Sequence, residues 1–166
     1  MKIKFIGGIN MNQLNLNAII CKEYKDDNIK GIFNTVYLKE GNDKYPFCIV
    51  ILTSIIGNMD LSGKALRIFM VKDDSNRIRI AHLTDFEIFN KVENKQMPVN
   101  DTKIVREGTN ILNLPNFEFI GFGEYEIRVY LADRQKSSDD FSDEILENKN
   151  DDFLKIIKHI SVKQDK

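Results

Sequence analysis

The chain has 166 residues, of which 42% are hydrophobic and 30% are charged, so it is long enough for one domain with a sizeable core. Its net charge of −1 at pH 7 lacks the basic excess that nucleic acid or an anionic membrane would attract, and neither partner is expected. The N-terminal apolar stretch is too short for a signal peptide, and the longest apolar run, 47–56, is about half a membrane span. These features predict a cytoplasmic protein.

Alternation of apolar and polar residues is the main structural signal in the first third of the chain. Residues 14–21 alternate in this way, which predicts a strand with one face toward a core. Residues 29–38 form a second alternating segment, and the polar stretch 22–28 is expected to join the two. Residues 47–56 are apolar on both faces, and their β-branched content after Pro46 favours a buried central strand over a helix.

A hairpin is predicted next. Residues 66–70 alternate, residues 73–76 carry the Asp and Asn side chains that bond their own backbone in turns, and residues 78–80 return. Residues 85–92 fit either a further strand or a short helix. Residues 97–106 are polar and irregular.

The clearest element is 124–131, in which Tyr125 and every second residue after it are apolar. A short extended segment at 111–114 precedes it. The composition then turns acidic, and Phe141, Ile145 and Leu146 have the spacing of a short helix. Residues 153–162 fit a strand or a helix, and closure of a sheet edge favours the strand.

Together these elements predict a mostly-β fold, an antiparallel β-sandwich of about eight strands, immunoglobulin-like or C2-like. The expected organisation is an N-terminal extension (1–13), the sandwich (14–132), an acidic loop or short helix (133–152), and a last strand or helix with a tail (153–166).

The chain has only two cysteines and two histidines, the side chains that most often bind zinc. Cys21 and Cys48 each lie in an apolar segment, which predicts two buried thiols in a reducing compartment; a disulfide would require neighbouring strands. His82 and His159 are far in sequence from both cysteines and from each other. No metal or cofactor ligands are assigned, and no cofactor is expected.

No catalytic residues are assigned either, and the protein is not expected to be an enzyme. The chain contains neither a Gly-x-Ser-x-Gly nucleophile elbow nor a phosphate-binding glycine loop. His82 lies near Asp85 and is interpreted as an ordinary strand-end histidine. Glu124 and Glu126 share the predicted outer face of their strand. An enzyme with a site assembled from scattered residues is a less favoured hypothesis.

Two sets of charged residues bear on calcium and nucleic-acid binding. Asp26, Asp27, Asp73 and Asp74 lie in predicted loops and Asp133 lies at a strand end, and calcium binding would require their carboxylates to converge. Arg77 and Arg79 form a small basic pair, which Arg67 would extend if it lay across the hairpin. The interpretation of these arginines is a solvent-exposed sheet face and not a nucleic-acid site.

Two segments carry a family resemblance. Residues 14–22 read LNLNAIICK and are followed by IKGIFNTV at 29–36; residues 115–119 read PNFEF and are followed by GEYEIRVYL at 123–131. Over 14–131 the chain resembles a bacterial family of uncharacterised β-sandwich proteins, although its first turn is rich in Lys and Asp with Gly31 as its one glycine. The resemblance implies the fold and supplies no function.

The function expected from these observations is a non-enzymatic interaction or structural module that acts through protein–protein contacts. The edge strand near the C-terminus and the acidic segment are the expected surfaces, for an unknown protein partner or for a homodimer. A calcium- or carbohydrate-binding sandwich is the alternative.

Overall fold

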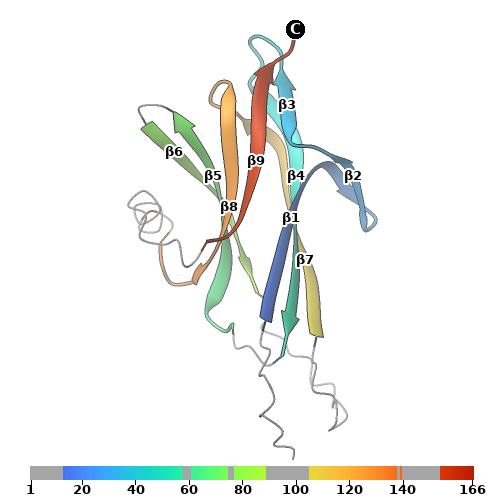
Figure 1. The fold of residues 1–166 in the computed structure, drawn as a ribbon, viewed down its shortest axis with the longest axis vertical. Coiled ribbons are helices and arrows are strands. Elements are labelled where there is room, and N and C mark those ends of the chain that lie inside the picture. Colours follow the sequence, from blue (N-terminus) through green and yellow to red (C-terminus); the bar gives the residue numbers. More distant parts are fainter. Residues whose placement is uncertain (1–12, 58–60, 75–76, 89–104, 138, 140–153) are drawn as a thin grey trace, which may run out of the picture.

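The computed structural model describes residues 13–57, 61–74, 77–88, 105–137, 139 and 154–166. Within these residues the chain forms nine strands in two facing sheets, which confirms the mostly-β sandwich (Figure 1). The strands are β1 (Gln13–Lys25), β2 (Asn28–Ile32), β3 (Thr35–Leu38), β4 (Lys44–Ile56), β5 (Lys64–Asp74), β6 (Arg77–Glu87), β7 (Val105–Glu118), β8 (Gly123–Asp133) and β9 (Leu154–Gln164).

Sheet A has the strand order β2-β1-β4-β7, and sheet B has the order β3-β9-β8-β5-β6. All neighbouring strands are antiparallel except β3 and β9, which run parallel. The predicted last strand is confirmed as β9. It lies between β3 and β8, so the expectation that this strand is an exposed sheet edge is wrong. The C-terminus follows it at the upper end of the view in Figure 1.

The main core lies between the two sheets, and alternation along each strand decides which side chains enter it. The central position predicted for 47–56 is confirmed, because β4 has a neighbour on each side and buries both faces. Its outward-facing Cys48 and Val50 belong to a separate small cluster with Cys21. The fully buried inner-face residues with the largest side chains are Phe47, Ile49, Ile51, Ile55, Leu66, Ile68, Ile127 and Ile160.

The connection predicted at 22–28 is wrong, because β1 continues to Lys25 and β2 begins at Asn28. The turn is only Asp26-Asp27, closed by pairing of Lys25 with Asn28. Both aspartates have positive φ, 50° and 58°, as a two-residue type I′ hairpin requires. The sequence pattern resembles that of a loop because three of the four residues 22–25 are polar and exposed, which removes the alternation.

The prediction of one continuous strand over 29–38 is also wrong. Residues 33–34 cross from sheet A to sheet B, so β2 and β3 belong to different sheets. The crossing is held by two backbone bonds: Phe33 N donates to Ile20 O (3.1 Å), and Ser161 N donates to Asn34 O (2.8 Å). Both halves alternate, so periodicity alone does not reveal the change of sheet.

The predicted hairpin of 66–70 with 78–80 is confirmed as β5 and β6, with different limits. Asp73 and Asp74 belong to β5 and not to the turn, and residues 85–87 end β6 instead of starting a new element. The short segment 111–114 lies within the 14-residue β7. Residues 89–104, and the helix expected around 141–146, lie outside the described residues.

Replacing Asp27 with glycine is expected to raise the free energy of unfolding by about 1 kcal/mol, because glycine adopts positive φ without the Cβ penalty. The matched control is Asp27→Ala, which also removes the bond that Tyr24 Oη donates to Asp27 Oδ1 (3.0 Å) but retains the strain. Urea unfolding followed by circular dichroism measures both variants. Equal stability of the two would contradict the assigned turn.

Candidate functional site

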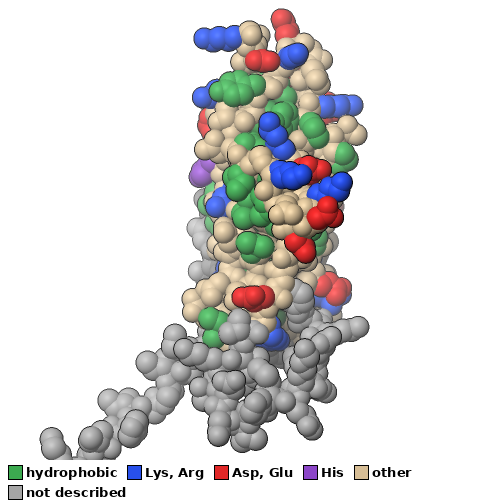
Figure 2. Space-filling model, turned by 90° about the vertical axis from the view of Figure 1, so that its right-hand side faces the viewer, with side chains coloured by type: hydrophobic (Ala, Val, Ile, Leu, Met, Phe, Trp, Pro, Cys, Tyr) green, Lys and Arg blue, Asp and Glu red, His purple; other side chains and the backbone are tan. Residues whose placement is uncertain are grey.

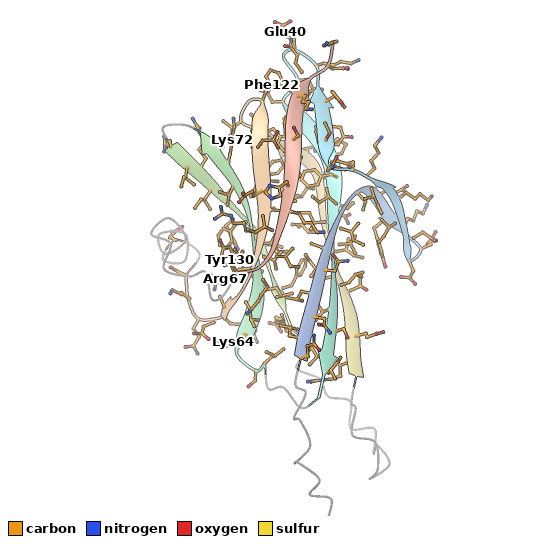
Figure 3. The ribbon with its side chains drawn as sticks, viewed as in Figure 1. Glu40, Lys64, Arg67, Lys72, Phe122 and Tyr130 are labelled. Atoms are coloured by element: carbon orange, nitrogen blue, oxygen red, sulfur yellow. The ribbon has the colours of Figure 1, made fainter. Side chains whose placement is uncertain are left out.

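The turn between β7 and β8 presents two apolar side chains to solvent. We call residues 119–122 the corner turn. Ile120 and Phe122 are 55% and 47% exposed, whereas Phe119 beside them is buried. Figure 3 places Phe122 at the upper end of the sandwich, near Lys72. Solitary exposed apolar residues are common in soluble proteins. Exposure alone therefore does not make Ile120 and Phe122 a binding site, and the rigidity and surroundings of the two side chains must be considered.

Two buried side chains hold the backbone of the corner turn. Lys72, near the end of β5, donates from Nζ to Ile120 O at 2.6 Å, and its ammonium lies 5.3 Å from the centre of the Tyr125 ring. Tyr125 Oη donates to Gly121 O at 2.7 Å. A tyrosine hydroxyl that bonds the backbone a few residues upstream is a known brace of β-sandwich corners. Two adjacent carbonyl groups of the turn, those of Ile120 and Gly121, are therefore hydrogen-bonded to buried side chains.

Two glycines let the chain make this turn. Gly121 and Gly123 have φ values of +73° and +129°, which L side chains rarely adopt. A Cβ at either position would lie 3.5 Å from the Lys72 side chain, an ordinary contact, so backbone conformation and not space requires glycine here.

Aromatic rings support the corner turn from the core. The Phe119 ring stacks with Phe47 (6.0 Å between centroids) and meets Phe117 and Tyr125 edge to face, at 4.9 and 5.1 Å. Phe119 N also donates to Asp43 O (2.9 Å), which ties the turn to the residue before β4. The backbone that bears the exposed Ile120 and Phe122 is thus fixed and packs on a cluster of buried aromatic rings.

A cavity of about 130 Å³ lies between β6 and β7 below the corner turn, and we call it the corner cavity. Its volume is close to that of the ~150 Å³ apolar cavities that hold a benzene-sized guest. Most of its lining is apolar, with three charged residues among it. The lining residues are Met70, Lys72, Arg79, Ile80, Ala81, Phe117, Glu118, Ile120 and Tyr125.

The aspartates considered for calcium do not converge. Asp133 pairs with Lys64 at one end of β5, whereas Asp73 and Asp74 end the same strand at the other, about 30 Å away at 3.3 Å per residue. Asp133 is instead bonded by Lys64 (Nζ–Oδ1 2.6 Å), which lowers the pKa of that carboxyl group. The described residues contain no cluster of three or more His, Cys, Asp or Glu side chains arranged to hold a metal ion.

The predicted arginine group is only partly correct. Arg77 and Arg79 are exposed on β6, but Arg67 pairs with Asp85 at the far end of the hairpin and is buried. Its Nη2 donates to the carbonyl oxygens of residues 133, 134 and 136. Figure 3 shows Arg67 beside Tyr130, its partner in the β5–β8 register. The sequence could not reveal this, because an arginine on an alternating outer face normally reaches solvent.

The interpretation of His82 as a strand-end histidine is wrong, because His82 lies within β6. Its Nε2 is 2.9 Å from Asp85 Oδ1. Asp85 Oδ1 is also 3.8 Å from Arg67 Nε, and the His82 ring packs against Phe69 (5.1 Å between centroids). Asp85 therefore lies between His82 and the buried Arg67 side chain. Glu124 and Glu126 lie on the predicted outer face of β8, where they bond Ser161 and Arg128. Each of these groups has a local structural partner.

The outer face of sheet A carries a polar hollow of about 340 Å³. In the space-filling view of this side of the molecule, hydrophobic side chains stand among basic and acidic ones (Figure 2). The hollow has one carboxylate, Glu107, whereas Ca²⁺ takes six to eight oxygen ligands. Its lining residues are Asn15, Leu16, Asn17, Leu52, Thr53, Ser54, Glu107, Gly108 and Thr109.

No protein-family model matches the chain, and no curated protein matches it. The described segments hold no helix of the length and apolar character needed to cross a membrane. The sequence does not predict the corner turn: Tyr125 is expected there only as an apolar strand residue, and nothing near Lys72 indicates that its ammonium reaches Ile120.

Proposed function

We propose that the protein is a non-enzymatic interaction module that binds a partner protein through the corner turn and the corner cavity. The observation that carries this proposal is the exposure of Ile120 and Phe122 on a backbone fixed by Lys72 and Tyr125. Protein interfaces depend on a few apolar or aromatic anchors, and anchors that are already rigid lose little conformational entropy on binding.

The corner cavity gives the proposed interface a pocket for a side chain of the partner. An apolar side chain of the partner would fill it, while Ile120 and Phe122 would pack on the partner's surface beside it. Arg79 and Glu118 at the cavity would contact polar groups around that side chain. This combination of protruding anchors, a small apolar pocket and charged surroundings matches the usual anatomy of protein interfaces.

A comparison of three full-length proteins tests the proposal by affinity capture from the native host. They are the wild type, the corner variant Ile120→Ser/Phe122→Ser, and a control variant, Ile32→Ser/Ile157→Ser, which removes exposed isoleucines elsewhere. We expect a partner that the wild type and the control retain and the corner variant loses about tenfold or more, because two anchors are worth over 1.4 kcal/mol. Sedimentation of the three proteins shows whether that partner is a second copy of the chain.

Unchanged melting temperatures of both variants establish that the folds are intact. Equal capture by all three proteins, or no specific capture by the wild type, would overturn the proposal. Carbohydrate binding at the polar hollow is the alternative, supported by the amide, hydroxyl and carboxyl side chains of its lining. It ranks second because that lining contains no aromatic ring for a sugar to stack on.

A further inference from the structure

Cys21 and Cys48 stand directly opposite each other in the antiparallel register of β1 and β4. Opposed residues in such a pair project to the same face, with Cα atoms about 4.5 or 5.5 Å apart depending on the hydrogen-bonding position. Both values fall within the roughly 4.4–6.8 Å that a disulfide spans. The backbone is therefore already positioned for a bond between two thiols that are free in this structure.

The pair lies outside the main core, in the small cluster on the outer face of sheet A. Val50 belongs to this cluster, and Tyr24 and Ile29 of the β1–β2 hairpin pack against it. Cys21 is fully buried, whereas Cys48 is 7% exposed. Cys48 Sγ donates to Oδ1 of the exposed Asn113 at 2.9 Å. A small oxidant can therefore approach the pair from the side of Cys48.

We propose that Cys21 and Cys48 form a redox modification site, which a peroxide of low molecular weight converts from a dithiol to an intramolecular disulfide. The Cys48 thiolate attacks a peroxide oxygen, the O–O bond breaks, and a sulfenic acid forms with release of water or an alcohol. Cys21 then attacks the Cys48 sulfur, the S–O bond breaks, and water leaves as the S–S bond forms. Two thiols are oxidised by two electrons, and one peroxide is reduced.

The geometry assigns different roles to the two cysteines. Cys48 reacts with the peroxide first because it is the more exposed of the two, and the buried Cys21 then attacks the Cys48 sulfur to form the disulfide. Burial raises the pKa of the Cys21 thiol, and the neighbouring Cys48 side chain raises it further. Because the thiolate is the reactive form, oxidation should accelerate as pH rises above neutrality.

The bond would join β1 to β4 beside the β1–β2 hairpin and close the chain between residues 21 and 48. Such a crosslink restricts the unfolded chain, so the oxidised protein should melt about 5–10 °C higher than the reduced protein. Opposed residues have Cβ atoms about 4.5–5.5 Å apart, and a disulfide holds them at about 3.5–4.5 Å. Because the Cβ atoms need to approach by only about 1 Å, the sandwich should keep its secondary structure.

The test uses folded full-length protein treated with hydrogen peroxide at several pH values. We expect the loss of both titratable thiols, a mass lower by about 2 Da, a crosslinked peptide joining Cys21 to Cys48, and reversal by dithiothreitol. Melting before and after treatment measures the stabilisation. Cys21→Ser should stop at a sulfenic acid on Cys48, which dimedone traps.

Three results would overturn the proposal. They are retention of both thiols under conditions that oxidise free glutathione, crosslinking between chains instead of within one, and oxidation of Cys48 to a sulfinic acid without disulfide formation. The first readouts come from the wild type, so they do not depend on folding of the serine variant.

Discussion

Replacing Phe119 with alanine is expected to lower the free energy of unfolding by about 4 kcal/mol. The Phe119 side chain is buried and contacts three other rings, those of Phe47, Phe117 and Tyr125. Its removal leaves a cavity that these large rings cannot fill by small movements, so the transfer and cavity contributions add. The corner turn would lose its support at the same time.

Phe122→Ala is the matched control. It removes the same kind of side chain three residues after Phe119, but at a half-exposed position. We expect it to change stability by less than about 1 kcal/mol. The chain has no tryptophan, so urea unfolding is followed by circular dichroism or tyrosine fluorescence. Similar losses in both variants would show that Phe119 does not anchor the corner turn.

Arg67→Met should lower the free energy of unfolding by about 3 kcal/mol, although residue 67 lies on the outer face of a sheet. Methionine retains much of the packing of the arginine stem but cannot donate to the carbonyl oxygens of residues 133, 134 and 136. It also removes the positive charge near Asp85. Several backbone acceptors would lose their partner in a single substitution.

Arg77→Met, at an exposed position of β6, is the control and should change stability by no more than about 0.5 kcal/mol. Arg67→Lys should remain destabilised, because an ammonium does not reproduce the planar fork of donors. A loss below about 1 kcal/mol for Arg67→Met would mean that water replaces the guanidinium at these carbonyls.

The corner turn and the cysteine pair make different demands on the chain. The corner turn is preorganised by buried groups, and its proposed role requires the exposed Ile120 and Phe122 to reach a partner. The cysteine pair lies on β1 and β4, which belong to sheet A, whereas Lys72 and Tyr125 belong to sheet B. Oxidation and partner binding can therefore be tested separately by the two experiments above.

Local patterning predicted the strands that bury one or both faces. Residues 14–21, 47–56 and 124–131 became β1, β4 and β8 because alternation or continuous apolar character follows directly from burial. The same logic failed at 22–28, where a strand leaves the core and its side chains no longer alternate. It also failed at 29–38, where alternation continues across a change of sheet.

The sequence by itself predicted the fold class and the central position of β4, since each follows from the pattern within single segments. Tertiary structure alone decided three pairs of partners that are distant in sequence. Lys72 bonds Ile120, 48 residues away, and Arg67 bonds Asp133, 66 residues away. Cys21 lies opposite Cys48, 27 residues away. Strand order and register create those contacts. No periodicity within one strand encodes which distant residue will stand opposite it.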